Sequence, residues 1–160
     1  MRHAKSDYPA HVASDFERPL NKRGFKDLPR MARLLRLFGP VPEVVLSSPA
    51  VRAKETAEGL AAAWDSGVEV RFDERLYLAP PAVLTQVAGD LPDAVETALV
   101  VAHNPGIEEW VGTLGGGQLV MPTAGLAALA LDIASWKALD EAGGTLLWFV
   151  VPRLVKAVQL

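Results

Sequence analysis

The sequence predicts an α/β fold, a three-layer α/β/α sandwich with a mostly parallel central sheet. Short runs of β-branched and apolar residues alternate along the chain with segments of helical periodicity, which is typical of a sheet covered on both faces. Two of these runs end in a polar residue followed by proline, at residues 44–49 and 99–105. Proline is favoured at the first position of a helix, with Ser or Asn as the preceding cap, so both runs indicate a strand leading into a helix.

The composition is that of one folded domain spanning residues 1–160. Half of the residues are hydrophobic, and the formal net charge is −3 with no long run of like charge. Neither nucleic acid nor a membrane surface is therefore an expected partner. The absence of cysteine excludes a disulfide framework, a thiolate zinc site and catalysis by a cysteine nucleophile. No leader-like or membrane-length apolar stretch is visible, so we expect a cytoplasmic protein.

The first regular element is predicted to be a helix over residues 22–38. Apolar residues recur there at three- and four-residue spacing, and Asn21 can cap the first turn. Pro29 is expected to kink this helix or to delay its regular part, and Gly39-Pro40 to end it. The preceding residues 4–20 contain two prolines among mixed polar residues and predict a loop.

The rest of the chain alternates between strand and helix. The final two strands need not run parallel to the others. Three consecutive glycines predict the end of a helix; they are not a Walker-type phosphate loop, because no Lys-Ser/Thr follows them. Strands are predicted at residues 43–47, 68–72, 97–102, 126–132 and 145–151, and helices at residues 49–64, 81–88, 105–114 and 135–139.

Arginine and histidine stand at three turns that are far apart in the sequence. Arg2 and His3 open the chain, Arg52 falls in the first turn of a predicted helix, and His103 ends a predicted strand. The carboxyl edge of an open α/β sheet is where ligands bind, and helix N-termini attract anions. Guanidinium groups match phosphate oxygens with a planar fork of donors. We therefore expect Arg2 and Arg52 to clamp a phosphate group.

The two histidines admit more than one interpretation. An imidazole nitrogen can attack phosphorus when the other ring nitrogen is held as a donor, which would make His3 a nucleophile. An exposed N-terminal histidine and a histidine satisfied at a strand end are the structural alternatives for His3 and His103. A metal site built on both lacks a third ligand at suitable spacing, and we expect no metal and no other cofactor.

An ordered set of motifs resembles the histidine phosphatase superfamily, also called phosphoglycerate-mutase-like. The set consists of Arg-His, Arg-Pro-Leu, Ser-Ser-Pro-x-x-Arg-x-x-x-Thr and His-Asn-Pro, and the resemblance covers nearly the whole chain. Within the superfamily, residues 2–6, 18–20 and 76–80 look like the phosphohistidine phosphatases of the SixA type. In this family a hydrophobic strand precedes the Arg-His pair, whereas only Met1 does here. We therefore expect the first strand to be absent or truncated.

The resemblance implies a metal-independent phosphatase that forms a phosphohistidine on His3, with His103 donating to the same phosphoryl group. Arg18 matches an arginine that the SixA type brings to the pocket, and Ser6 would contribute a hydroxyl to the phosphate. Glu74 matches, by position, the general acid of larger superfamily members. A surface arginine, a turn-forming serine and a solvated loop glutamate are the respective alternatives.

The substrate implied by the SixA resemblance is a phosphohistidine on a protein, with phosphate as the product and a monomer as the acting species. A promiscuous phosphomonoesterase fits the same motifs. A phosphate-binding domain without turnover is a further alternative, and so is a mutase acting on small phosphorylated acids. The mutase ranks last, because the chain is short and has no insertion that could enclose such a substrate.

Overall fold

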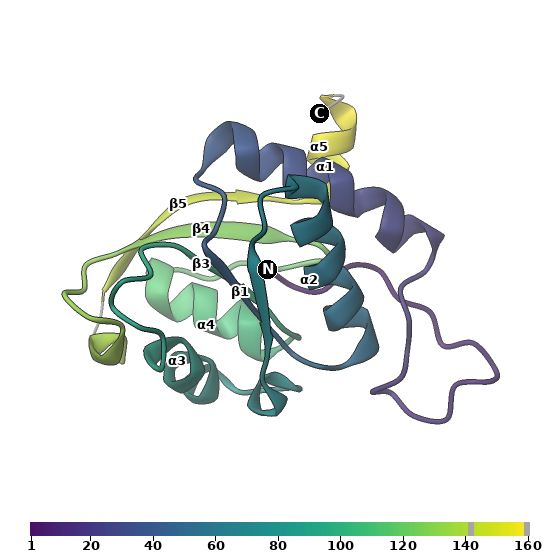
Figure 1. Cartoon of the computed structure of the whole chain (residues 1–160), viewed down its shortest axis with the longest axis horizontal. Helices are drawn as coiled ribbons and strands as arrows, with labels where there is room; N and C mark the ends of the chain where they lie inside the picture. Colours follow the sequence, from purple (N-terminus) through teal and green to yellow (C-terminus); the bar gives the residue numbers. More distant parts are fainter. Residues whose placement is uncertain (141–142, 159–160) are drawn as a thin grey trace.

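Five short strands form the centre of the molecule in the computed structural model, which describes residues 1–140 and 143–158 (Figure 1). Three of them make a parallel sheet in the order β2-β1-β3, and the last two make an antiparallel pair. The strands are β1 (Val44–Ser47), β2 (Glu69–Phe72), β3 (Ala98–Val101), β4 (Leu126–Leu131) and β5 (Gly144–Val150). The parallel part of the predicted sheet is confirmed, and the final two strands are antiparallel, which the prediction had allowed.

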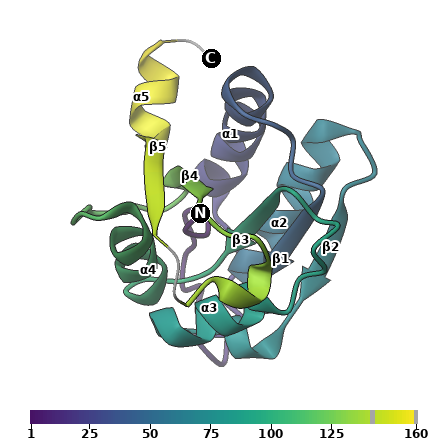
Figure 2. The ribbon, with the colours of Figure 1, turned by 90° about the vertical axis from the view of Figure 1, so that its left-hand side faces the viewer.

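Residues 1–4 join the two sheets. The backbone N–H of His3 donates to the carbonyl oxygen of Ala102, just beyond β3, at 3.1 Å. On the other side, the N–H of Arg2 donates to the carbonyl oxygen of Gly125, just before β4, at 3.1 Å. The backbone of the Arg-His pair is thereby held between β3 and β4, and Figure 2 shows the N-terminus in this central place.

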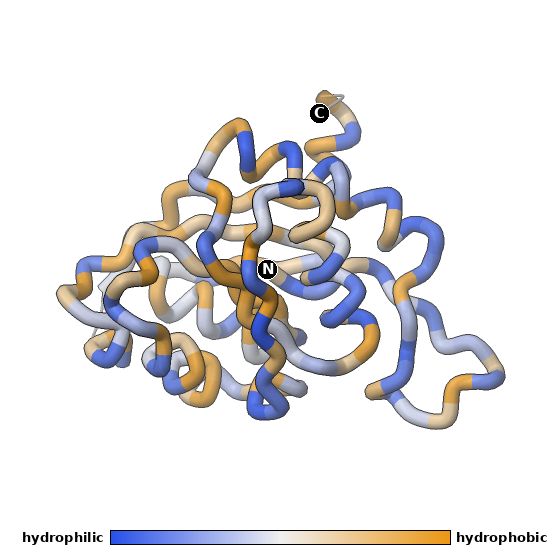
Figure 3. Tube along the Cα trace, in the orientation of Figure 1, coloured by the Kyte–Doolittle hydropathy of each residue, from blue (hydrophilic) through white to orange (hydrophobic). Residues whose placement is uncertain are grey.

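Helices cover both faces of the parallel sheet, so the three-layer prediction is confirmed. Because side chains alternate along a strand, Val45, Leu99 and Val101 pack with one pair of helices, and Val44, Leu46 and Val100 with the other. The first pair is α1 (Lys22–Phe38) and α2 (Val51–Trp64), and the second is α3 (Pro81–Gly89) and α4 (Gly106–Gly115). The central strands are among the most hydrophobic parts of the trace in Figure 3. The short α5 (Pro152–Ala157) packs against α1.

The helix prediction is most accurate for α1. Asn21 caps it by accepting from the N–H of Gly24 at 2.9 Å. Pro29 lies within the helix and does not delay its start, so that alternative is wrong. The glycine stop after α4 is also confirmed, because Gly116 adopts φ 71° there. Such a left-handed backbone is readily adopted by glycine.

The predicted starts of α2 and α4 are wrong. Ala50 is the N-cap of α2, so Pro49 lies outside the helix and Ser48 does not cap it. Pro105 takes the cap position of α4, so Asn104 does not cap that helix. The predicted helix at residues 135–139 is a single 3₁₀ turn, η2 (Trp136–Ala138). Within the described residues, no helix has the length and apolar character needed to cross a membrane.

Candidate active site

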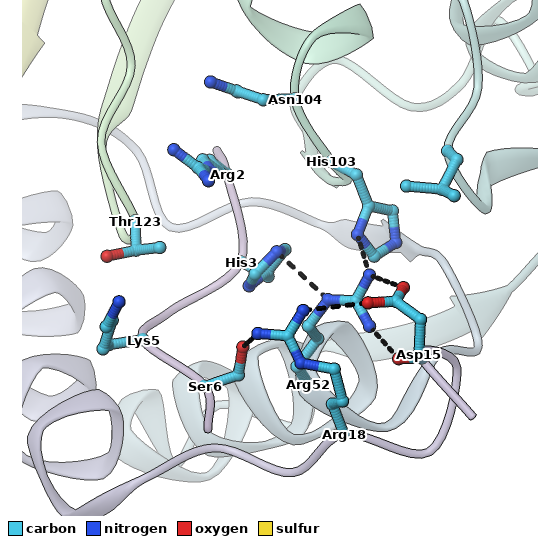
Figure 4. A pocket seen from close by; sticks show the side chains of 11 residues that line it. Arg2, His3, Lys5, Ser6, Asp15, Arg18, Arg52, His103, Asn104 and Thr123 are labelled. Atoms are coloured by element: carbon cyan, nitrogen blue, oxygen red, sulfur yellow. Dashed lines mark hydrogen bonds and ion pairs between the residues drawn. The ribbon is translucent and has the colours of Figure 1, made fainter. Parts of the chain in front are cut away.

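A pocket of about 340 Å³ opens at the carboxyl edge of the parallel sheet. Residues that follow β1 and β3 reach it, as expected for an open α/β sheet, and Figure 4 shows their side chains converging. Six of the seven predicted site residues line it, namely Arg2, His3, Ser6, Arg18, Arg52 and His103. The other lining residues are Lys5, Asp15, Leu78, Asn104 and Thr123.

The His3 ring is fixed in one orientation. It is buried, and its Nδ1 lies 2.8 Å from the carbonyl oxygen of Ala4. A carbonyl oxygen can only accept, so Nδ1 carries the proton and Nε2 keeps its lone pair. Nε2 accepts from the Nε–H of Arg52 at 3.2 Å and lies at the pocket. His3 therefore has the tautomer that a nucleophilic imidazole requires.

Arg52 connects the two histidines. Its side chain is only 3% exposed, and besides His3 it contacts Nδ1 of His103, which lies 3.2 Å from Nη2. The Nε2 of His103 lies 2.8 Å from the hydroxyl of Ser48. Since Nδ1 accepts from the guanidinium, Nε2 carries the proton and donates to Ser48. The serine that sequence reasoning placed at a helix cap thus serves to orient His103.

Both histidines are neutral at pH 7. Burial lowers the pKa of His3 to about 4; the bond to the Ala4 carbonyl raises it in part, and the charges of Arg52, Arg2 and Arg18 lower it further. Burial also lowers the pKa of His103 to about 3, with further lowering by His3 and Arg52. Two uncharged imidazoles therefore lie beside the guanidinium groups, which can receive the charge of an anion.

Arg2 forms the opposite wall of the pocket (Figure 4). Its Nη1–H donates to the carbonyl oxygen of Met121 at 3.0 Å, while its Nε is buried with no hydrogen-bond partner in the described part of the chain. Asn104 donates to the same Met121 carbonyl at 3.1 Å and to Oε2 of Glu108 at 3.0 Å. These bonds anchor the segment that carries Thr123 to the start of α4.

Arg18 and Ser6 both line the pocket, and their side chains contact each other. The Nη2–H of Arg18 donates to the Ser6 hydroxyl at 3.0 Å, and its Nη1–H donates to Oδ1 of Asp15 at 2.8 Å. Oδ2 of Asp15 accepts from Nη2 of Arg52 at 2.8 Å and from the hydroxyl of Tyr77 at 3.0 Å. One carboxylate thus bridges both arginines and a tyrosine.

Asp15 and Tyr77 are site residues that sequence reasoning missed. Asp15 lies in a loop with other acidic residues, and nothing in the local pattern distinguishes it from Asp7 or Glu17. Tyr77 lies within the segment 76–80 that carries part of the SixA resemblance, which was the available signal. Its ring packs edge-on against His103, with centroids 5.5 Å apart.

Glu74 is the one predicted site residue that the structure leaves outside. It is exposed at the start of the 3₁₀ turn η1 (Glu74–Leu76), and it does not line the pocket. This position does not favour a role in protonating a leaving group. In residues 1–140 and 143–158, no three His, Cys, Asp or Glu side chains are grouped so that they could hold a metal ion.

Comparisons with known proteins identify the family to which the chain is similar. A family model described as "Histidine phosphatase superfamily (branch 1)" matches residues 1–77. An uncharacterized protein of Mycobacterium leprae is 36% identical over 169 residues, covering 96% of this chain and 100% of the relative. A second one, from Mycobacterium tuberculosis (strain CDC 1551 / Oshkosh), is 32% identical over 166 residues, with coverages of 96% and 100%.

The solved structure of the protein histidine phosphatase SixA complexed with tungstate is similar over nearly the whole chain. The TM-score is 0.81 at 25% identity, and the match covers 97% of this chain and 96% of that one. The motifs around His3, Arg52 and His103 are those on which the resemblance depends, and they meet in one pocket. The chain therefore belongs to the histidine phosphatase superfamily, in its SixA-type branch, and is a phosphatase.

Proposed function

We propose that the protein hydrolyses a phosphoryl group through a phosphohistidine formed on His3. The observation that carries this proposal is the pinned, neutral ring of His3, whose Nε2 lies at the pocket beside the Arg52 guanidinium. In the first step, the Nε2 lone pair leaves its hydrogen bond with the Nε–H of Arg52 and attacks phosphorus; a P–N bond forms, and the bond from phosphorus to the leaving group breaks. In the second step, water attacks phosphorus, and the P–N bond breaks to release phosphate and restore the lone pair of Nε2.

Charge on the phosphoryl oxygens would be stabilised by the arginines of the pocket. Arg2, Arg18 and Arg52 are charged at all relevant pH values, and guanidinium groups stabilise phosphoryl charge that develops in the transition state. Because both histidines are neutral at pH 7, the positive charge that faces the phosphoryl oxygens comes from arginines and not from the histidines. We assign His103 as a donor to the same phosphoryl group, which requires its Nε2–H to exchange the Ser48 hydroxyl for a phosphoryl oxygen.

The substrate class that we propose is a phosphohistidine on a protein. Asp15 is the carboxylate among the pocket-lining residues. Partial burial raises its pKa, but the hydrogen bonds from Arg18, Tyr77 and Arg52 outweigh that effect and lower it to about 2. Such a group carries no proton at neutral pH and cannot act as a general acid. A leaving group of low basicity, such as imidazole, is therefore favoured over an alkoxide.

The same reasoning allows aryl phosphates, since phenolates are also weakly basic leaving groups. A promiscuous phosphomonoesterase remains the second candidate. It would differ from the first by accepting alkyl phosphates, whose leaving oxygens need a proton.

The test compares three substrates with wild type, His3→Ala and His11→Ala. The substrates are a phosphohistidine-containing protein, p-nitrophenyl phosphate and glycerol phosphate. His11 is an exposed loop residue and the matched control. We expect His3→Ala to lose turnover of every substrate, His11→Ala to keep it, and wild type to prefer the first two substrates.

A rapid-quench measurement with ³²P-labelled substrate completes the test. Label that is acid-labile, stable in base and absent from His3→Ala is expected for a phosphohistidine intermediate. Phosphate binding without turnover in wild type would make the protein a phosphate-binding domain. More than a trace of activity in His3→Ala would contradict the mechanism.

A further inference from the structure

We infer that the carboxylate of Asp15 is a resident counter-anion of the phosphoryl site, which the substrate displaces and which in turn limits the affinity for the product phosphate. This inference rests on the proposed function, because it assumes that the phosphoryl group binds beside His3 and Arg52. It assigns to Asp15 a role in the affinity of the site, and to Tyr77 the role of a donor that serves both anions.

The donors around Asp15 are those that a phosphoryl oxygen would use. The carboxylate accepts from Arg18, Arg52 and Tyr77 at 2.8, 2.8 and 3.0 Å, respectively. Two of these donors are guanidinium groups, whose planar forks suit phosphate and carboxylate alike. Figure 4 shows the Asp15 side chain beside the Arg52 guanidinium at the edge of the pocket.

Too few N–H groups of Arg52 are free to bind a second anion. A guanidinium has five N–H groups, and four of those on Arg52 are engaged within the protein. Nε–H donates to His3, one Nη2–H to His103, the other Nη2–H to Oδ2 of Asp15, and one Nη1–H to the backbone oxygen of Asp15. As long as both histidines keep their hydrogen bonds to Arg52, a phosphoryl group at His3 can obtain a bidentate contact with Arg52 only when Asp15 releases its N–H groups.

Electrostatics favours exchange over sharing. The Asp15 carboxylate is charged at neutral pH, and a phosphoryl dianion held by the same guanidinium would be repelled by it within a few ångströms. Arg52 is 3% exposed and built into α2, whereas the Asp15 side chain is 42% exposed in the loop between residues 6 and 20. The carboxylate can therefore move into solvent without disrupting the core, while the guanidinium stays in place.

The exchange has a consequence for product release. After hydrolysis, inorganic phosphate occupies the donors that Asp15 held before. A returning carboxylate competes with the product for Arg18, Arg52 and Tyr77, and so favours its release. A phosphorylated protein makes contacts beyond the phosphoryl group, which inorganic phosphate lacks. Competition by the carboxylate therefore weakens the binding of the product more than the binding of the substrate.

Substitution of Asp15 tests the inference through the affinity for inorganic phosphate, measured by titration calorimetry and as product inhibition. We expect Asp15→Asn and Asp15→Ala each to bind phosphate at least tenfold more tightly than wild type. Glu17→Gln is the matched control, because it removes one carboxylate from the same loop and Glu17 does not line the pocket. It is expected to leave the affinity unchanged.

Unchanged or weaker phosphate binding in both Asp15 variants would overturn the inference, because it would make Asp15 a residue that only positions Arg52. Failure of the proposed function has a different signature. Wild type would then show no His3-dependent turnover, whatever the phosphate affinities of the Asp15 variants.

Tyr77→Phe provides a second readout through a double-mutant cycle. In wild type the Tyr77 hydroxyl stabilises the carboxylate in the free site and phosphate in the bound site, so its removal should change the phosphate affinity little. In the Asp15→Ala background no carboxylate is present at this position. Removal of the Tyr77 hydroxyl should then weaken phosphate binding at least threefold more than it does in wild type. Equal losses in both backgrounds would contradict the exchange.

Discussion

Replacement of Arg52 by lysine isolates the geometry of the guanidinium from its charge. Lysine keeps the positive charge but presents a compact ammonium without the planar fork. Arg52 is buried at the base of the pocket and contacts His3 through Nε and both His103 and the Asp15 carboxylate through Nη2. A lysine at this position cannot reproduce those directions at once, so the variant tests whether the fork itself is required.

The size of the effect follows from the bonds that are lost. A hydrogen bond to a charged group contributes about 1.5–3 kcal/mol. If the ammonium keeps one phosphoryl contact and loses two of the guanidinium contacts, the transition state is destabilised by roughly 3–6 kcal/mol. Each 1.36 kcal/mol is a factor of ten in rate, so kcat/KM should fall by roughly 10²- to 10⁴-fold.

The assay is kcat/KM with p-nitrophenyl phosphate, accompanied by a circular dichroism spectrum and a melting curve to establish that the variant is folded. Arg36→Lys is the control, since Arg36 is exposed on α1 and does not line the pocket. Activity of Arg52→Lys within fivefold of wild type would refute the argument, because the charge alone would then suffice.

Three further outcomes are expected. First, protonation removes the Nε2 lone pair of His3, whose pKa burial lowers to about 4. Activity should therefore fall as the pH drops through about 4, and an acid limb of kcat/KM near the ordinary histidine value of about 6.5 would contradict this. Second, Glu74→Gln should change kcat/KM for aryl phosphate and phosphohistidine less than twofold, since Glu74 lies outside the pocket. A tenfold loss would instead indicate that Glu74 is the general acid that protonates the leaving group. Third, Gly106→Ala should lower the free energy of unfolding by about 1–3 kcal/mol, because its Cβ would lie 1.8 Å from the carbonyl oxygen of Ala79. Urea denaturation measures the free energy of unfolding, and Gly117→Ala is the control, because a Cβ at Gly117 would have no atom within 4 Å.

Local patterns in the sequence determined most of the secondary structure. Helix α1 has the bounds Lys22–Phe38 that its apolar spacing and its Asn21 cap predict, because both signals act within one or two turns. The parallel strands likewise lie within a residue of their predicted ends. The start of α2 was missed, since Ser48 accepts from Ala50 N–H and contacts His103, which is 55 residues away.

The resemblance and the motif order named six of the residues that line the pocket. They did not predict how these residues orient one another or shift one another's pKa values. That the ring of His3 is pinned through Nδ1 depends on the Ala4 carbonyl next to it, and its neutral state depends on burial. Both are properties of the packed chain, because a pKa follows from the solvent and the charges that surround a group.

The sequence alone predicted the fold class, and it named His3 as the candidate nucleophile and Arg2 and Arg52 as the candidate phosphate clamp, because residue type and the order of motifs carry this information. Only the tertiary structure decided the places of Asp15 and Glu74. Asp15 reaches Arg52 across 37 residues of chain, whereas Glu74 remains exposed on η1 outside the pocket. Contacts between distant segments depend on the path of a loop over the folded core, and no periodicity or spacing within a loop specifies that path.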